Sequence, residues 1–163
     1  MPVSVFGATA ALLQSDYFPH YTFGATSHPT STAVGTVLTR VGAIVSGRVQ
    51  GLGLDPSAID NTGEPIAYQF CQDLVLAGAA YRVGLAFTGR GMPGDVVDTW
   101  RRAFRDGLKD LSDARTARVV LVDAYGAATA GRIRTHVQEA STRPTATSDI
   151  EIDDPEFVRD MDL

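Results

Sequence analysis

The sequence predicts a mainly α-helical protein: a bundle of three helices, or of four, with a short β-hairpin-like element and extended N- and C-terminal arms. The first observation behind this prediction is the apolar segment from Ile66 to Phe87, which indicates a helix that is apolar on nearly every face. Such a helix has to be covered by others, because each exposed methylene group forfeits about 0.8 kcal/mol. The second observation is that an amphipathic segment lies on either side of it, and these two segments can supply the cover.

The first long helix is expected to begin near Thr30 or Ser31, since both residue types are good N-caps. Gly51, Gly53 and Pro56 are expected to end it. Its apolar residues recur at spacings of three and four, which predicts one buried stripe. They are Val34, Val37, Leu38, Val41, Ile44, Val45, Val49 and Leu52.

The central helix is expected to open at residues 63–65, with Pro65 in the first turn and Asn61 or Thr62 as its cap. It should continue to about Thr88, with Gly89 as the C-cap. The small residues at 77–80 favour a close crossing with a partner helix.

The third helix is expected to start after Pro93 and Gly94, with Asp95 near its positive end. Apolar residues make one stripe along it, and charged residues occupy the other face. The stripe consists of Val97, Trp100, Phe104, Leu108 and Leu111.

The segments outside these helices differ in character. Residues 1–30 predict an aromatic N-terminal arm with a short helix over 6–14, and the aromatic run 17–23 should pack on the bundle or on a neighbouring subunit. The β-branched residues at 117–124 predict a strand, with 133–137 as its partner. The expected divisions are therefore an arm (1–30), a helical bundle (31–112), a strand-like extension (113–140) and an acidic tail (141–163).

Composition limits the classes of protein to consider. The 163 residues carry a net charge of −5, but residues 149–163 alone hold seven carboxylates against one arginine, about −6, so the rest of the chain is close to neutral. The single cysteine, Cys71, excludes a disulfide framework. The N-terminus has no basic region typical of a secretory signal, and no apolar run is long enough to cross about 30 Å of hydrocarbon. These features favour a soluble protein made in a cytoplasm.

No constellation of catalytic residues stands out, and no enzyme activity, cofactor site or metal site is predicted. Residues 89–94 match G-x-G-x-x-G, but a predicted helix rather than a strand precedes them, so a turn between helices is the better interpretation. His20, His28 and His136 lack the spacing of zinc ligands. The acidic residues at 149–154 lack the glycine turn of an EF-hand loop.

Interfaces are the functional sites that the sequence predicts. The candidates are an aromatic group near the N-terminus, an arginine face on the third helix, valines of the strand-like extension and apolar residues of the acidic tail. They are Tyr17, Phe18, Tyr21, Phe23, Arg101, Arg102, Arg105, Val120, Val122, Ile150, Ile152, Phe157 and Val158.

Several features together resemble a known family. They are the segment Tyr17-Phe18-Pro19, the loop 27–30 opening a helix, the small residues at 77–80 in a central helix, and a third helix that ends in Lys109-Asp110-Leu111 before a polar extension. Over residues 15–111 this pattern is similar to the head–tail connector (adaptor) proteins of tailed bacteriophages. These are small helical-bundle subunits that form a ring beneath the portal.

The resemblance implies a structural virion protein without catalytic residues or cofactors. Its implied partners are further copies of itself in a ring, twelve-fold in this family, together with the portal protein and tail or neck proteins. DNA would pass through the lumen without sequence-specific binding, and no membrane is involved. The implied location is the neck of the virion, and the host cytoplasm during assembly.

Two other classes stay open from the sequence. One is a cytoplasmic helical module that binds a partner helix or DNA, the latter through the arginine face in a salt-sensitive way. The other is an enzyme with a site between helices, which needs a pocket with convergent polar groups, and the central helix supplies few of them.

Overall fold

The structure, a computed structural model, describes residues 6–88 and 92–126, and this part of the chain is mainly helical. No strand occurs within it. The five helices, in chain order, are α1 (Ala10–Tyr17), α2 (Ser31–Gly51), α3 (Pro65–Leu85), α4 (Gly94–Ser112) and α5 (Ala114–Val120). All described residues belong to one of two compact units, residues 1–129, and the other unit lies outside the described residues.

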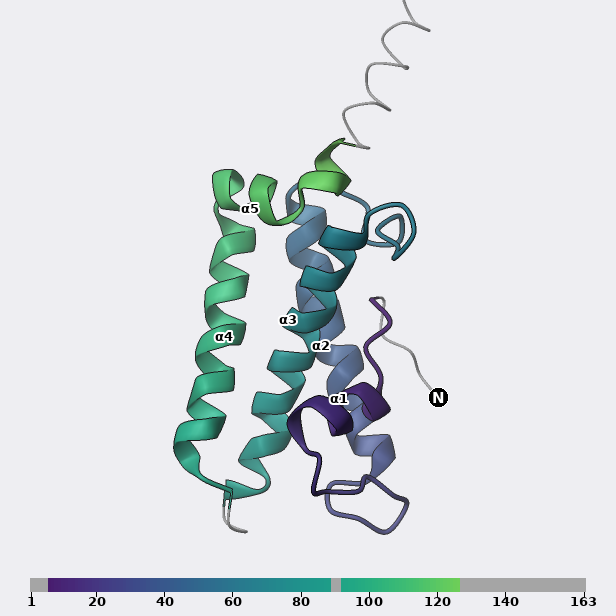
Figure 1. The fold of residues 1–163 in the computed structure, drawn as a ribbon, viewed down its shortest axis with the longest axis vertical. Coiled ribbons are helices and arrows are strands. Elements are labelled where there is room, and N and C mark those ends of the chain that lie inside the picture. The colour runs from purple at the N-terminus through teal and green to yellow at the C-terminus, as the bar shows by residue number, and fades with distance from the viewer. Residues whose placement is uncertain (1–5, 89–91, 127–163) are drawn as a thin grey trace, which may run out of the picture. The chain divides into compact units, whose positions relative to one another are not determined.

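The centre of α3 is the most deeply buried part of this unit. Seven consecutive residues, Leu74–Ala80, are buried, so every face of the helix is covered over two turns. The cover comes from α2 and α4, which both pack along α3 (Figure 1). An apolar helix gains stability from cover on all sides, and the described structure places the segment predicted at 66–87 in that position.

Glycines allow α3 and α4 to approach closely. A Cβ atom added at Gly78 of α3 would lie 2.6 Å from the ring of Phe104 on α4 and 2.8 Å from Val41 on α2. The reverse arrangement occurs one turn away, where a Cβ at Gly107 of α4 would lie 2.6 Å from Leu74. A Cβ atom added at Gly84 of α3 would likewise lie 2.9 Å from the ring of Trp100 on α4. The small residues predicted to favour a close crossing are therefore at the contact itself.

The ends of the helices follow the local signals in most cases. Thr30 is the N-cap of α2, and its hydroxyl accepts a hydrogen bond from the amide of Ala33 at 3.2 Å. Beyond the end of α2, Gly53 has φ +79°, a conformation that glycine adopts without strain. Pro65 stands in the first turn of α3, and Asp95 in the first turn of α4. These boundaries agree with the sequence prediction.

The predicted cap of α3 is wrong. Neither Asn61 nor Thr62 caps the helix, because α3 begins after Glu64, whose side chain makes no capping hydrogen bond. The amides of Ile66 and Ala67 instead donate to the carboxylate of Asp123, at 2.7 and 3.0 Å. The helix also ends at Leu85, three residues before the expected end at Thr88, and Gly89 lies outside the described residues.

The N-terminal segment, expected as an extended arm, contributes to the core over residues 6–23. The helix predicted at 6–14 is α1, which begins four residues later, at Ala10, and ends at Tyr17. Thr9 is its N-cap. Phe6, Leu13 and Phe18 are fully buried. The side-chain amide of Gln72 on α3 also donates to the carbonyl of Phe6 at 3.1 Å. In this position the apolar side chains of the segment bury surface that would be exposed to water in a free arm.

The strand predicted at 117–124 is wrong, because this segment is helical. It forms α5 and, after a turn at Leu121, a further helical stretch from 122 to the end of the described residues at 126. Ala117, Leu121 and Ala124, spaced by four and three, are buried, which is the pattern of a helix face. Packing through this stripe outweighs the strand propensity of the valines. The proposed partner strand, 133–137, lies outside the described residues.

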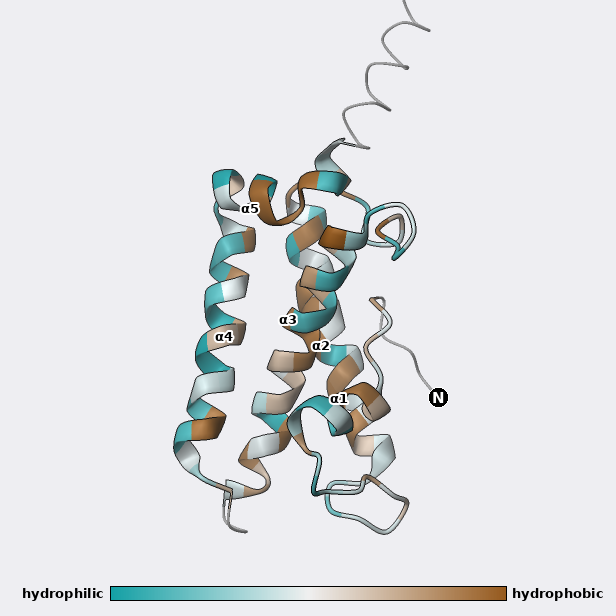
Figure 2. Ribbon diagram, in the orientation of Figure 1, coloured by the Kyte–Doolittle hydropathy of each residue, from teal (hydrophilic) through white to brown (hydrophobic). Residues whose placement is uncertain are grey.

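The outer side of α4 is hydrophilic along much of its length, while α3 carries many apolar residues (Figure 2). Within the predicted apolar stripe of α4, Val97 and Leu111 are buried, and Trp100, Phe104 and Leu108 pack against the core while partly exposed. A helix with one apolar and one charged face is typical of the surface of a globular domain. Among the described residues, no helix is long and apolar enough to cross a membrane.

Candidate interaction surfaces

The aromatic residues of the N-terminal segment form a cluster inside the chain. Phe18 lies at its centre, with ring centroids 5.3 Å from Trp100 on α4 and 5.8 Å from Phe87 just beyond α3. Tyr21 lies 6.2 Å and Phe23 5.5 Å from Phe18. Most of these pairs are edge-to-face, the arrangement that aromatic rings favour. The cluster joins the loop after α1 to the adjacent ends of α3 and α4.

This cluster decides which of the predicted aromatic interface residues can touch a partner. Phe18 is fully buried, so it has no surface to offer while the fold is intact. Tyr17, whose ring lies 5.5 Å from Trp100, is partly buried, as are Tyr21 and Phe23. Burial, followed by the nearby charges of Asp73 and Asp16, raises the pKa of the Tyr17 hydroxyl above its usual value.

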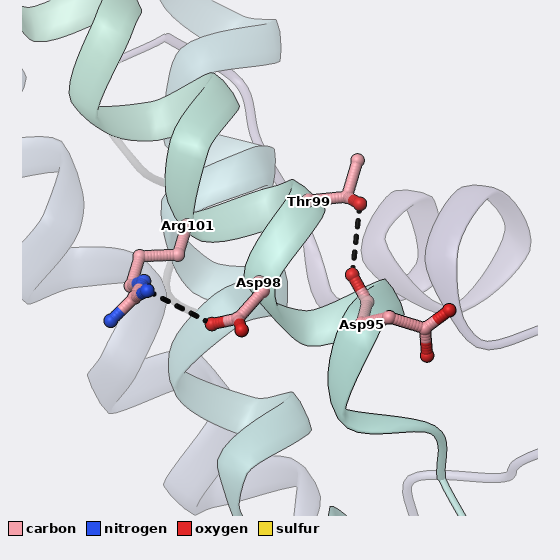
Figure 3. A network of polar contacts seen from close by, with 4 residues as sticks. All are labelled: Asp95, Asp98, Thr99 and Arg101. Atoms are coloured by element: carbon pink, nitrogen blue, oxygen red, sulfur yellow. Dashed lines mark hydrogen bonds and ion pairs between the residues drawn. The ribbon is translucent and has the colours of Figure 1, made fainter.

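The predicted arginine face of α4 is exposed to solvent, but it is not purely basic. The guanidinium of Arg101 pairs with the carboxylate of Asp98 at 3.1 Å, and Figure 3 shows the two side chains pointing toward each other on the surface of the helix. One turn further, Arg105 lies 3.7 Å from Asp106. Carboxylates among the arginines weaken the attraction of this face for phosphates. Exposed pairs of this kind add at most about 1 kcal/mol to stability.

Figure 3 also shows a hydrogen bond between a side chain and the backbone in the first turns of α4. The hydroxyl of Thr99 donates to the backbone carbonyl of Asp95 at 2.9 Å, so Thr99 points back along its own helix (Figure 3). The carboxylate of Asp95 lies near the positive end of α4, where a negative charge is favourable. These contacts all lie within α4 itself.

Three exposed apolar side chains belong to α5, to the residues that follow it and to the start of α3, and we call them together the α5 patch. It consists of Ile66, which is 55% exposed, Val119, 73% exposed, and Val122, 51% exposed. Val122 was a predicted interface residue, and Val120, the other predicted valine, is partly buried. The capping carboxylate of Asp123 lies beside this patch and holds α5 against α3 through the amide of Ile66.

A groove between α1 and the first half of α2 is the feature that sequence reasoning missed. It has a volume of about 750 Å³ and a mostly apolar lining. Ala10 and Gln14 contribute from α1, Gly35, Thr36 and Arg40 from α2. Among the described residues that line it, Arg40 alone is charged. No local pattern marks such a groove, because it depends on the spacing of two helices whose sequences lie about twenty residues apart.

The cysteine and two of the three histidines lie in the part of the chain that the structure describes. Cys71 is buried in α3, and burial, with a smaller contribution from the charge of Asp123, raises the pKa of its thiol to about 12. No group of three or more potential metal ligands occurs in residues 6–88 and 92–126. His20 and His28 are exposed. His136, the tail candidates Ile150, Ile152, Phe157 and Val158, and the start of the glycine motif lie outside the described residues.

Comparison with known proteins adds no relative. No family model matches the chain, and no curated protein and no solved structure is similar to it.

Proposed function

We propose that the chain is a structural subunit of a phage particle, a head–tail connector that forms a ring between the portal and the tail. The proposal starts from the resemblance over residues 15–111, which includes an aromatic segment, a central helix rich in small residues and a third helix ending in Lys109-Asp110-Leu111. Three long helices in this order, with α3 covered by α2 and α4, are compatible with the three-helix bundle of that family.

The observation that carries the proposal is the presence of two unlike apolar surfaces at separate places. The groove between α1 and α2 lies along the first half of α2, whereas the α5 patch lies near the other end of the same helix (Figure 1). A ring requires a heterologous contact, in which one surface of each subunit meets a different surface of the next. A two-fold dimer would instead use a single self-complementary surface.

The proposed partners are further copies of the chain, the portal protein above and tail or neck proteins below. DNA passing through the lumen would meet side chains without being read in sequence. The mixed charge of the α4 face suits that role better than a basic face would, because strong attraction to phosphates would slow the passage of DNA.

Electron microscopy and native mass spectrometry of the purified protein, alone and mixed with the portal protein of its particle, test this proposal. The expected result is a closed ring seated on the portal. A monomer in solution is compatible with the proposal, because the subunits of such a ring can require the portal as the surface on which they assemble. A protein that stays monomeric in the presence of the portal would overturn it.

The second candidate is a cytoplasmic helical module that binds protein or DNA, and the exposed Arg101, Arg102 and Arg105 favour it. This candidate predicts that a labelled DNA duplex binds at 50 mM salt and is released at 200 mM salt, and that Arg102→Ala weakens the binding. Fluorescence anisotropy measures both effects. We expect no such binding even at 50 mM salt, because Asp98 and Asp106 offset two of the three arginines.

A further inference from the structure

The α2 side of the groove between α1 and α2 comes from a stretch of sequence that contains no carboxylate. Between Asp16 and Asp55 there is no Asp or Glu. Arg40 at the groove and Arg48 two turns further along α2 are both exposed. Neither has a carboxylate within ion-pair distance in the part of the chain that the structure describes.

These charges continue the groove along α2. Thr36, Arg40, Ile44 and Arg48 are each four residues apart, so each lies next to the one before it along the helix, in a row that turns around α2 by about 40° per step. Ile44 is 37% exposed, although isoleucine is among the most often buried residue types. The surface therefore offers an apolar groove, then a cation, an apolar side chain and a second cation.

The chain contains one segment with the matching pattern, residues 149–158. It alternates carboxylates with apolar residues as Asp149-Ile150-Glu151-Ile152-Asp153, and Phe157 and Val158 follow. In an extended conformation, alternate side chains point to opposite sides. Ile150 and Ile152 would then lie on one side and could enter the groove together, and the acidic residues between them make the segment as a whole complementary in charge to Arg40 and Arg48. A volume of about 750 Å³ is in the usual range for a binding pocket.

We propose that the groove between α1 and α2 binds the C-terminal segment 149–158 of a second copy of this chain. The proposal rests on the proposed ring and deepens it by naming one of the two surfaces through which neighbouring subunits meet. Residues 127–148 separate this segment from the described chain, and an extended chain of that length spans up to about 70 Å, which is enough to reach a neighbour.

The other exposed surfaces fit this segment less well. The α5 patch has mixed charge around it, because Arg115 and Arg118 of α5 are exposed and the carboxylate of Asp123 also lies beside it. On α4, the carboxylates of Asp98 and Asp106 already pair with arginines. Complementary potentials steer association and exclude wrong partners, so the carboxylate-free face of α2 is the favoured site.

Disulfide trapping between two full-length variants tests the proposal. One variant carries Thr36→Cys in the groove, and the other carries Ile152→Cys together with a mass tag. After mixing and mild oxidation, we expect the heterodimeric disulfide to form at least tenfold faster than with Ser57→Cys in place of Thr36→Cys. Ser57 is a matched control, since it is exposed in the loop after α2, away from the groove. The native Cys71 is buried in both variants.

Charge reversal provides the second readout. Arg40→Glu in the groove variant should slow trapping at least fivefold, and Glu151→Arg in the tail variant should restore at least half of the lost rate. Circular dichroism of each variant verifies that it is folded, and all of these positions are either exposed or outside the described core.

Equal trapping rates at Thr36→Cys and Ser57→Cys would overturn the proposal. So would an exclusively intramolecular disulfide in a chain that carries both Thr36→Cys and Ile152→Cys, because the occupant would then be the chain's own tail. If trapping fails while rings form on the portal, this inference falls and the proposed function stands. If trapping succeeds and no ring forms on the portal, the inference stands and the proposed function falls.

Discussion

Asp123 stabilises a helix to which it does not belong. Its carboxylate accepts hydrogen bonds from the amides of Ile66 and Ala67, which have no partner within the helix because they lie in its first turn, where Pro65 has no N–H. A capping residue normally precedes the helix directly, but Glu64 makes no such bond. This one carboxylate therefore caps α3 and fixes the segment after α5 in the same place.

Replacing Asp123 should lower the stability of the fold. For Asp123→Ala we expect the free energy of unfolding to fall by about 1 kcal/mol, the usual cost of losing an N-terminal cap. Urea denaturation followed by circular dichroism measures this change. Asp106→Ala, which removes an exposed carboxylate of α4, should stay within about 0.5 kcal/mol of the wild type. Equal effects of the two substitutions would show that the cap contributes nothing.

Cys71 should behave as a buried apolar residue below its raised pKa. In the native protein at pH 8, a thiol reagent should fail to modify it, since the thiol is buried and keeps its proton, and modification should follow only after unfolding. Stability should also fall as the pH rises from about 9 toward 12. In that range the unfolded thiol loses its proton while the folded one, with a pKa of about 12, retains it.

Comparing the wild type with Cys71→Ala isolates this effect from other groups that titrate at high pH. The variant should lose less stability than the wild type between pH 8 and pH 11, as measured by urea denaturation at each pH. Rapid modification of native Cys71 at pH 8 would contradict the burial on which both expectations depend.

At the scale of the elements, the contact between α3 and its neighbours depends on glycine. Gly78 lies between Phe104 of α4 and Val41 of α2, so a methyl group added there cannot move away from one neighbour without pressing on the other. Gly47 of α2 has nothing within 4 Å of the same position. The two glycines thus separate the packing effect of an added methyl group from its effect on helix propensity.

The paired substitutions should change stability in opposite directions. Gly47→Ala should raise the free energy of unfolding by about 0.5–1 kcal/mol, because alanine favours the helix. For Gly78→Ala, overpacking of about 1–3 kcal/mol exceeds the same gain, so we expect a net loss of about 1 kcal/mol. Thermal and urea denaturation of both variants measure the difference. A stabilised Gly78→Ala would mean that the helices can separate at little cost.

The elements that the sequence predicted correctly are those with local signals. Thr30 starts α2, Pro65 starts α3, and the four-residue spacing of Trp100, Phe104 and Leu108 marks the inner face of α4. The error at α5 has a physical reason as well. Consecutive valines at 119 and 120 suggested a strand, whereas Ala117, Leu121 and Ala124 already had the spacing of a buried helix face.

The candidate surfaces were predictable only in part, because they depend on contacts between distant segments. Arg101 and Arg105 are exposed, as expected from the charged side of an amphipathic helix. Phe18 is instead enclosed by Phe87 and Trp100, about 70 and 80 residues further along the chain. The groove at Arg40 exists only once α1 has packed beside α2, so no window of the sequence could reveal it.

At the scale of the whole molecule, the distribution of charge separates the folded core from the C-terminal segment. The core described here is built from residues 6–126. Residues 149–163 carry a charge of about −6, whereas the chain as a whole carries −5. Six of these fifteen residues are apolar and seven are acidic, the composition on which the proposed contact with a basic and apolar surface depends.

Removing residues 149–163 should consequently leave the fold intact and impair assembly. We expect a chain that ends at residue 148 to keep its helical circular dichroism and a melting temperature within about 2 °C of the wild type, since the core lies in residues 6–126. Its joining to the portal, followed by native mass spectrometry, should fall at least tenfold.

A full-length variant with residues 149–163 in scrambled order keeps the charge of about −6 and serves as the matched control. Failure of this variant to assemble would show that the order of apolar and acidic residues matters, beyond charge alone. Normal assembly of the truncated chain would exclude a role for the segment, and unfolding of that chain would mean that the segment belongs to the core.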